Sequence, residues 1–132
     1  MGRTSTWLLG TTATLAMAIS ACGGGSPAGP SSAPPPGPAG TTMTISSSGA
    51  SPRSLTVPAG TRVRFVNNDS RAHEMTSDPH PEHTDCPAIN DVGRLNPGQS
   101  RETGNLVVAR TCGFHDHDDP SNASLRGTIV IQ

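Results

Sequence analysis

Apolar and polar residues alternate over short stretches from residue 42 onward, and Gly, Pro, Asn or Ser residues break these stretches at near-regular intervals. Such alternation predicts β-strands that bury one face. We expect strands at residues 42–46, 54–57, 62–67, 72–76, 102–108 and 127–131. No window shows the apolar spacing of an amphipathic helix. The pattern therefore predicts an all-β fold, either a sandwich or a barrel.

The alternation stops between residues 77 and 96, which predicts a long irregular loop. This segment is polar, rich in proline, and contains His80, His83 and Cys86. Long ordered loops on β scaffolds often carry function. His80 and His83 have two interpretations: a solvated polar loop, or metal binding. Metal binding could take the form of a second metal site, or of a mouth that captures the ion near a main site elsewhere in the domain.

The first 21 residues have the composition of a secretory signal peptide. Arg3 precedes an apolar run that is too short to span a membrane. The run ends in Ile-Ser-Ala-Cys22, which resembles the bacterial lipobox and implies that Cys22 is acylated. Ordinary cleavage that leaves a free thiol is the alternative. We expect an exported protein, periplasmic or at the cell surface, that a lipid anchors to the membrane without spanning it.

Residues 22–40 contain almost only Gly, Pro, Ser and Ala after the cysteine. Such a sequence has no large apolar side chains to offset the entropy of ordering, so we expect a disordered tether. Residues 41–132 are long enough for one small domain. After Cys22 the chain has eight arginines and ten carboxylates, a balance that gives no case for nucleic acid as a partner.

Metal-binding residue types crowd the segment from 110 to 119, where Cys112, His115 and His117 fall within six residues. All five histidines of the chain lie between residues 73 and 117. One thiolate and two imidazoles form the ligand set of a trigonal blue-copper site. This pattern predicts copper as the cofactor, with His73 and Cys112 as ligands and either His115 or His117 as the third.

Cys86 and Cys112 also allow a second interpretation. If Cys22 is acylated, they remain as an even pair in an exported chain, for which a disulfide is the default. A Cys86–Cys112 bridge would tie the long loop to the last strands and would remove the thiolate. A third option places both thiols on one metal ion.

The order and spacing of these segments resemble the cupredoxin family. Residues 55–68 followed by His73 are similar to the family's strand, Pro-Ala-Gly turn, second strand and first histidine ligand. Residues 95–100 are similar to its Pro-Gly turn, and residues 112–131 to its ligand loop and last strand. The resemblance implies a Greek-key β-sandwich with copper near one end. The chain departs from the family at the weak axial ligand, where Leu125 replaces the usual methionine.

The resemblance implies a carrier of single electrons between exported redox proteins. The alternatives are a copper-binding or scavenging module that takes copper from donors and passes it to acceptors, using His80, His83 and Cys86, and a metal-free interaction domain stapled by a disulfide. The sequence has no arrangement that suggests hydrolytic catalysis, so we do not expect an enzyme. We expect a monomer.

Overall fold

The computed structural model describes residues 41–132. The predicted signal peptide, the acylation of Cys22 and the tether at residues 22–40 lie outside the described residues. Among the described residues, no helix is both long enough and apolar enough to cross a membrane.

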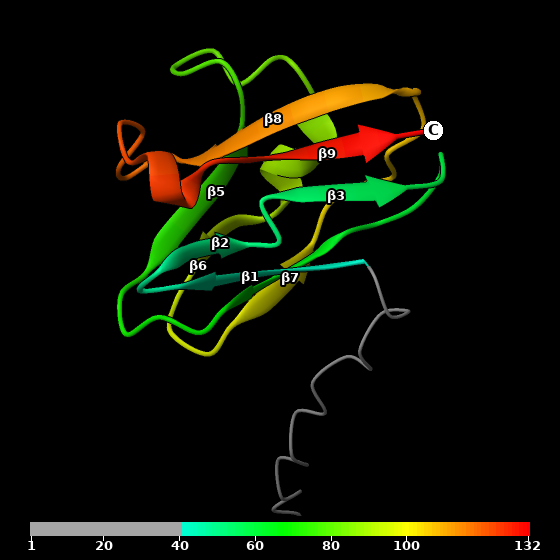
Figure 1. Ribbon diagram of the computed structural model, residues 1–132. Coiled ribbons are helices and arrows are strands. Elements are labelled where there is room, and N and C mark those ends of the chain that lie inside the picture. Colours follow the sequence, from blue (N-terminus) through cyan, green and yellow to red (C-terminus); the bar gives the residue numbers. More distant parts are fainter. Residues whose placement is uncertain (1–40) are drawn as a thin grey trace, which may run out of the picture. The chain divides into compact units, whose positions relative to one another are not determined.

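The described residues form two mixed β-sheets (Figure 1). The four-stranded sheet has the order β2-β1-β4-β7, made of β1 (Thr42–Ser46), β2 (Gly49–Ser51), β4 (Arg64–Asn67) and β7 (Ser100–Glu102). The five-stranded sheet has the order β3-β9-β8-β5-β6, made of β3 (Ser54–Val57), β9 (Gly127–Ile131), β8 (Arg110–Asp116), β5 (His73–Ser77) and β6 (Gly93–Leu95). The pairs β1–β4 and β3–β9 are parallel, and the other pairs are antiparallel.

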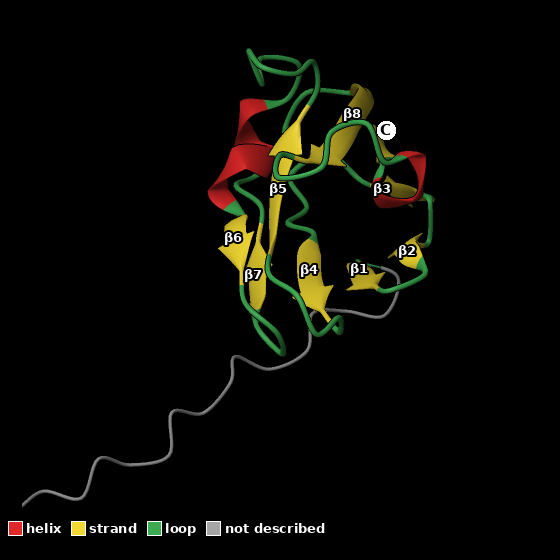
Figure 2. Cartoon of the chain, turned by 90° about the vertical axis from the view of Figure 1, so that its left-hand side faces the viewer, coloured by secondary structure: helices red, strands yellow, loops and turns green. Residues whose placement is uncertain are grey.

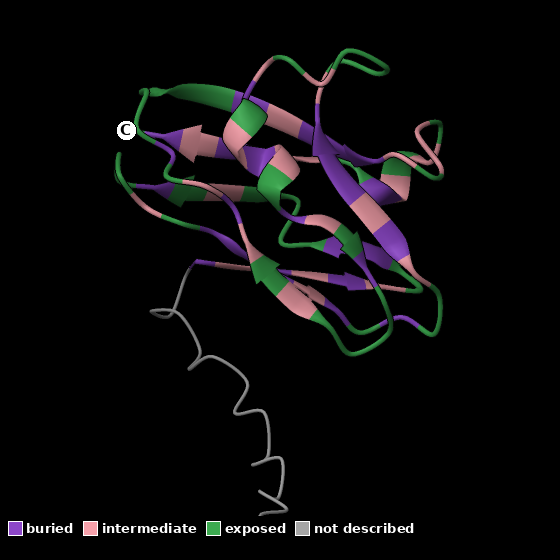
Figure 3. Ribbon diagram, turned by 180° about the vertical axis from the view of Figure 1, so that it is seen from behind, coloured by how far each residue is buried: buried purple, intermediate pink, exposed green. Residues whose placement is uncertain are grey.

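The core lies between the two sheets. Phe65 of β4 and Phe114 of β8 meet edge to face, with ring centroids 5.2 Å apart, and both are fully buried. These are the only aromatic residues of the described domain, so Val, Ile, Leu and Met supply most of the remaining core. Figure 3 shows buried residues along both sheets and exposed residues at the loop tips. The predicted all-β sandwich is confirmed.

Three predicted strands coincide with β1, β3 and β9, and two others differ from β4 and β5 by one or two residues. The predicted strand at 102–108 is wrong. β7 ends at Glu102, and the following segment makes an isolated bridge between Leu106 and Thr61. Val107 and Val108, which follow this bridge, are 63% and 61% exposed.

The long loop predicted after β5 is present and contains a short 3-10 helix, η1 (Pro87–Asp91), that the sequence pattern did not indicate. η1 lies beside β5 (Figure 2) and buries Ile89. Asn90 of η1 accepts a hydrogen bond from the backbone N–H of Ser77 at 2.9 Å and donates one to the carbonyl of His83 at 2.9 Å. Asn90 therefore connects the later part of the loop to the end of β5 and to His83 in the middle of the loop.

Candidate metal site

The alternation of side chains along β8 separates its metal-capable residues onto two faces. Phe114 packs on Phe65 of the opposite sheet, so it marks the inner face. Successive side chains of a strand point to opposite sides. Cys112 and Asp116 therefore share the inner face with Phe114 and are buried, whereas His115 points to the outer face.

The register between β5 and β8 extends this division. Met75 lies opposite Asp116, and Thr76 lies opposite His115. Residues directly opposite each other in a sheet point to the same side. His73, two residues before Met75, is therefore on the inner face. His73 and His115 lie on opposite faces of the sheet, and His117, the other candidate for the third ligand, groups with His115 and not with His73. The trigonal copper site predicted from the sequence is therefore not assembled.

Cys112 forms a disulfide with Cys86, across a Cα–Cα distance of 5.7 Å. The disulfide alternative from the sequence is thus the one found in the structure. The expectation of a Cys112 thiolate ligand is wrong, as is the option of both thiols on one metal, because neither sulfur is a thiolate when bonded to the other. The bridge joins the end of the long loop to the inner face of β8.

Leu125, which stands where the resemblance implied an axial methionine, is also in the core. It lies in the short 3-10 helix η2 (Ala123–Leu125) and is 2% exposed.

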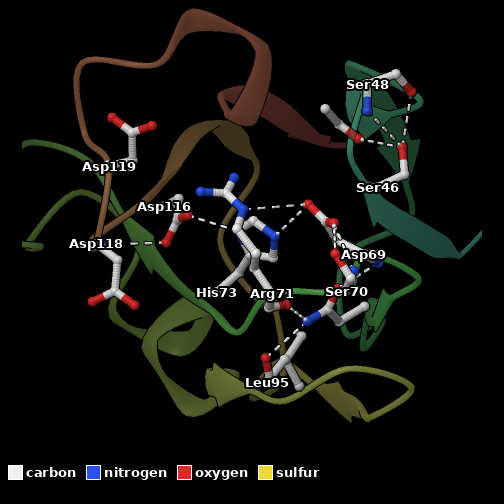
Figure 4. Close-up of polar contacts among 12 residues, drawn as sticks. Ser46, Ser48, Asp69, Ser70, Arg71, His73, Leu95, Asp116, Asp118 and Asp119 are labelled. Carbon is white, nitrogen blue, oxygen red and sulfur yellow. Dashed lines mark hydrogen bonds and ion pairs between the residues drawn. The ribbon is translucent and has the colours of Figure 1, made fainter.

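His73 is enclosed between two carboxylates (Figure 4). Its Nδ1 lies 2.8 Å from Oδ2 of Asp116, and its Nε2 lies 3.1 Å from Oδ2 of Asp69. The side chain is 1% exposed. Both ring nitrogens are engaged by carboxylate oxygens, so neither is free to bind a metal ion. The prediction that His73 is the first ligand is corrected accordingly.

The two carboxylates of this Asp69–His73–Asp116 cluster are held by further hydrogen bonds. Oδ1 of Asp116 accepts from the backbone N–H of Glu74 at 2.9 Å, and Oδ1 of Asp69 accepts from that of Ser70 at 2.6 Å. Burial acts to raise the pKa of Asp69, but the hydrogen bonds from His73 and Ser70 outweigh it and hold the pKa below its ordinary value. The cluster is a buried structural network that joins β5 to the end of β8.

Four histidines form the candidate site on the other side of β8: His80 and His83 from the long loop, and His115 and His117 from the end of the strand. Each offers one ring nitrogen, and these four atoms all lie within 4.8 Å of one another. Nδ1 of His117 is 3.2 Å from Nε2 of His83. The structure thus combines both candidates for the third ligand, His115 and His117, with the two loop histidines.

This four-histidine cluster runs from the protein interior to the surface. His115 is fully buried, His83 and His117 are half-buried, and His80 is exposed. An ion would therefore enter from the side of His80. Four imidazoles without a thiolate are a donor set that suits copper, zinc or nickel.

His83 has two features that fit a ligand. Its φ of 53° is in the left-handed region, which non-glycine residues rarely adopt and which is often retained at functional sites. Burial lowers the pKa of its imidazole, and the neighbouring rings of His115, His117 and His80 lower the pKa further. The ring therefore tends to stay neutral, which leaves a lone pair available for a metal ion.

The lowered pKa of His83 predicts that the metal-free domain loses stability in mild acid. In the unfolded chain His83 has its ordinary pKa of 6.5, so below that pH the unfolded state binds more protons than the folded state. The free energy of unfolding should not change through His83 above pH 6.5 and should fall as the pH is lowered below it. Urea unfolding midpoints at about pH 7.5 and pH 5.5 test this. A His83→Gln variant should show a smaller decrease, and an equal decrease in both proteins would contradict the assignment.

His80 and His83 are the site residues that the sequence left undecided. The clustering of all five histidines within one part of the chain favoured metal chemistry, but it did not indicate which of them meet. The sequence did not show how the loop that carries His80 and His83 reaches β8. In the structure, the Cys86–Cys112 disulfide brings the end of this loop to β8.

No family model and no curated protein matches the chain. Solved structures do resemble it. A purple cupredoxin from Nitrosopumilus maritimus is 20% identical with a TM-score of 0.55, over 70% of this chain and 99% of the other. Oxidized plastocyanin from Dryopteris crassirhizoma is 20% identical with a TM-score of 0.54, over 69% of this chain and 99% of the other. An oxidized amicyanin mutant is 18% identical with a TM-score of 0.54, over 70% and 82%. At these identities the likeness concerns the fold, and the described part of the chain has the cupredoxin fold.

Proposed function

We propose that this domain is a copper-binding module of the cupredoxin fold in which His80, His83, His115 and His117 hold the ion. The observation that carries the proposal is the convergence of their four ring nitrogens within 4.8 Å. Among divalent first-row metals, copper binds nitrogen donors most tightly. The fold supports the choice of copper, since its structural neighbours include Cu(I) forms of two amicyanin mutants.

The donor set favours copper capture as the role of this module. Soft thiolate ligands stabilise Cu(I), and the sulfur of Cys112 is in a disulfide. An all-imidazole site therefore favours Cu(II). Two of its four donors come from an irregular loop, and one of these, His80, is exposed where it can meet an incoming ion. These features support the copper-binding or scavenging alternative over a thiolate-based electron carrier.

Single-electron transfer is the second candidate, and one observation favours it. His115 is fully buried on a regular strand, so at least one ligand would move little on reduction. Voltammetry of the copper-loaded protein distinguishes the two roles. A carrier should give a reversible wave with copper retained in both states, whereas a capture module should release copper when it is reduced.

We also propose that the chain works outside the cytoplasm, anchored through an acylated Cys22, and exchanges copper with other exported proteins. The lipobox-like segment and the disulfide between Cys86 and Cys112 support this location, because structural disulfides persist in oxidising compartments. The intact mass of the mature protein from membranes tests the acylation, and a mass without lipid would exclude it.

The proposed site predicts that His115→Ala lowers the affinity for Cu(II) by more than about 100-fold, since loss of a direct ligand should exceed the 10–100-fold effect of losing an outer partner. Competition titration against a chelator measures this. The paramagnetic resonance spectrum of the Cu(II) protein should show nitrogen ligands, and its optical spectrum should lack an intense thiolate-to-copper band. Such an intense band, or a variant that binds as tightly as the parent, would contradict the proposal. Ser48→Ala, at an exposed residue of the β1–β2 turn, is the control.

A further inference from the structure

Asp78, the first residue after β5, contacts the most buried histidine of the cluster. Its Oδ1 lies 2.6 Å from Nδ1 of His115. A carboxylate oxygen accepts hydrogen bonds, so this contact requires the proton of a neutral imidazole to be on Nδ1 and leaves the lone pair on Nε2. Nε2 lies on the other side of the ring, 3.4 Å from the hydroxyl of Thr76.

The backbone holds Asp78 in this position. Its N–H donates to the carbonyl of Gly113 at 3.0 Å, and its own carbonyl accepts from the N–H of Asp85 at 2.8 Å. The guanidinium of Arg126 lies 3.6 Å from the oxygen that contacts His115, and it partly balances the charge of the carboxylate. The contact between Asp78 and His115 is therefore built from fixed elements.

Gly113 provides the space for this carboxylate. A Cβ at Gly113 would lie 2.1 Å from Oδ2 and 2.9 Å from Cγ of Asp78. Gly113 is not among the glycines with positive φ, so its backbone conformation does not require glycine. It precedes His115 by two residues and faces the same side of β8. The absence of a side chain at Gly113 thus allows Asp78 to reach His115.

We propose that Asp78 is a positioning residue that fixes the tautomer and the ring orientation of His115, so that Nε2 is the atom presented to the metal ion, and that Gly113 is required to admit it. Metal-binding histidines usually donate their second ring N–H to a carboxylate or a carbonyl, which raises the basicity of the ligating nitrogen. The proposal rests on the proposed copper site, since it names how one ligand of that site is held.

The affinity test uses three variants and one control. Asp78→Ala should lower the affinity for Cu(II) by about 10–100-fold. Asp78→Asn should lower it less, because the amide oxygen still accepts from Nδ1–H. Gly113→Ala should resemble Asp78→Ala, because the new methyl group displaces the carboxylate. The control is Asp118→Asn, in which the lost carboxylate neighbours His117 but pairs with Arg94 at 2.8 Å, and its affinity should not change.

Long-range proton–nitrogen NMR correlations of the metal-free protein provide a readout that does not depend on copper. In the parent protein the proton of His115 should be on Nδ1, and in Asp78→Ala the ring should show both tautomers or the Nε2–H form. If Asp78→Ala does not fold, Asp78→Asn and Gly113→Ala decide the question.

The copper site and the role of Asp78 can be disproved separately. A parent protein that binds no copper would overturn the copper site, and the NMR result would still show whether Asp78 sets the tautomer. A parent that binds copper, with Asp78→Ala and Gly113→Ala binding equally well or with the proton of His115 on Nε2 in the parent, would overturn the role of Asp78.

Discussion

Replacing His73 with leucine is expected to destabilise the domain by about 3–5 kcal/mol, because it leaves two buried carboxylates without their shared hydrogen-bonding partner. The change leaves the carboxylates of Asp69 and Asp116, which are 5% and 2% exposed, without the group between them. Urea unfolding measures the loss. The affinity of the folded variant for Cu(II) should stay within about twofold of the parent, because His73 lies on the opposite face of the sheet from His115.

The exposed loop histidine His80 offers the matched comparison. His80→Leu should leave the free energy of unfolding of the metal-free protein nearly unchanged and should weaken copper binding, which is the reverse of the His73 result. If His73→Leu keeps its stability and loses copper, His73 is a ligand and the four-histidine site is assigned wrongly.

Removing the disulfide is the second large effect. Cys86→Ser and Cys112→Ser should each lower the free energy of unfolding by about 2–5 kcal/mol, the range for a native disulfide in a small secreted domain. The bond closes a loop with a sequence separation of 26 residues. For a loop of that size the chain-entropy relation alone gives about 3–4 kcal/mol. Both variants should also bind Cu(II) more weakly, because the loop that carries His80 and His83 is no longer tied to β8.

Urea unfolding with and without a thiol reductant measures this effect, and the intact mass of the parent should be two hydrogens below that of its reduced form. Cys22→Ser is the control, since Cys22 lies outside the described domain and its loss should not change the free energy of unfolding. If Cys112→Ser alone lost copper while Cys86→Ser behaved as the parent, Cys112 would be a thiolate ligand.

Some strands were predictable from local pattern, and others were not. β1, β3 and β9 have clear β-type sequences, and they form where expected. β8 lacks a visible apolar alternation, although its inner face is buried, because that face carries Cys112 and Asp116 beside Phe114. Its outer face is also covered towards the end, where the loop lies over His115. Local alternation cannot indicate a strand whose two faces are both covered in this way.

The candidate site was also predictable only in part from the sequence. The residue types were recognisable from the sequence, since histidines, cysteines and carboxylates gather between residues 69 and 119. Which of these residues contact one another was not predictable from the sequence. The face of the sheet to which a side chain points depends on strand register, and a shift of one residue reverses it. His73 consequently contacts Asp116 on the inner face, while His115 contacts Asp78 on the outer face.

Local alternation and composition were enough to predict that residues 41–132 form an all-β sandwich and that metal-capable side chains crowd residues 69–119. The tertiary structure was needed to show that Cys112 bonds to Cys86, that His73 belongs to a buried hydrogen-bond network, and that His80 and His83 join His115 and His117. The Cys86–Cys112 bond, the contact between His73 and Asp116 and the meeting of the two pairs of histidines each join segments that are distant in the chain. They are decided by strand register and by the path of the loop after β5, which local sequence does not encode.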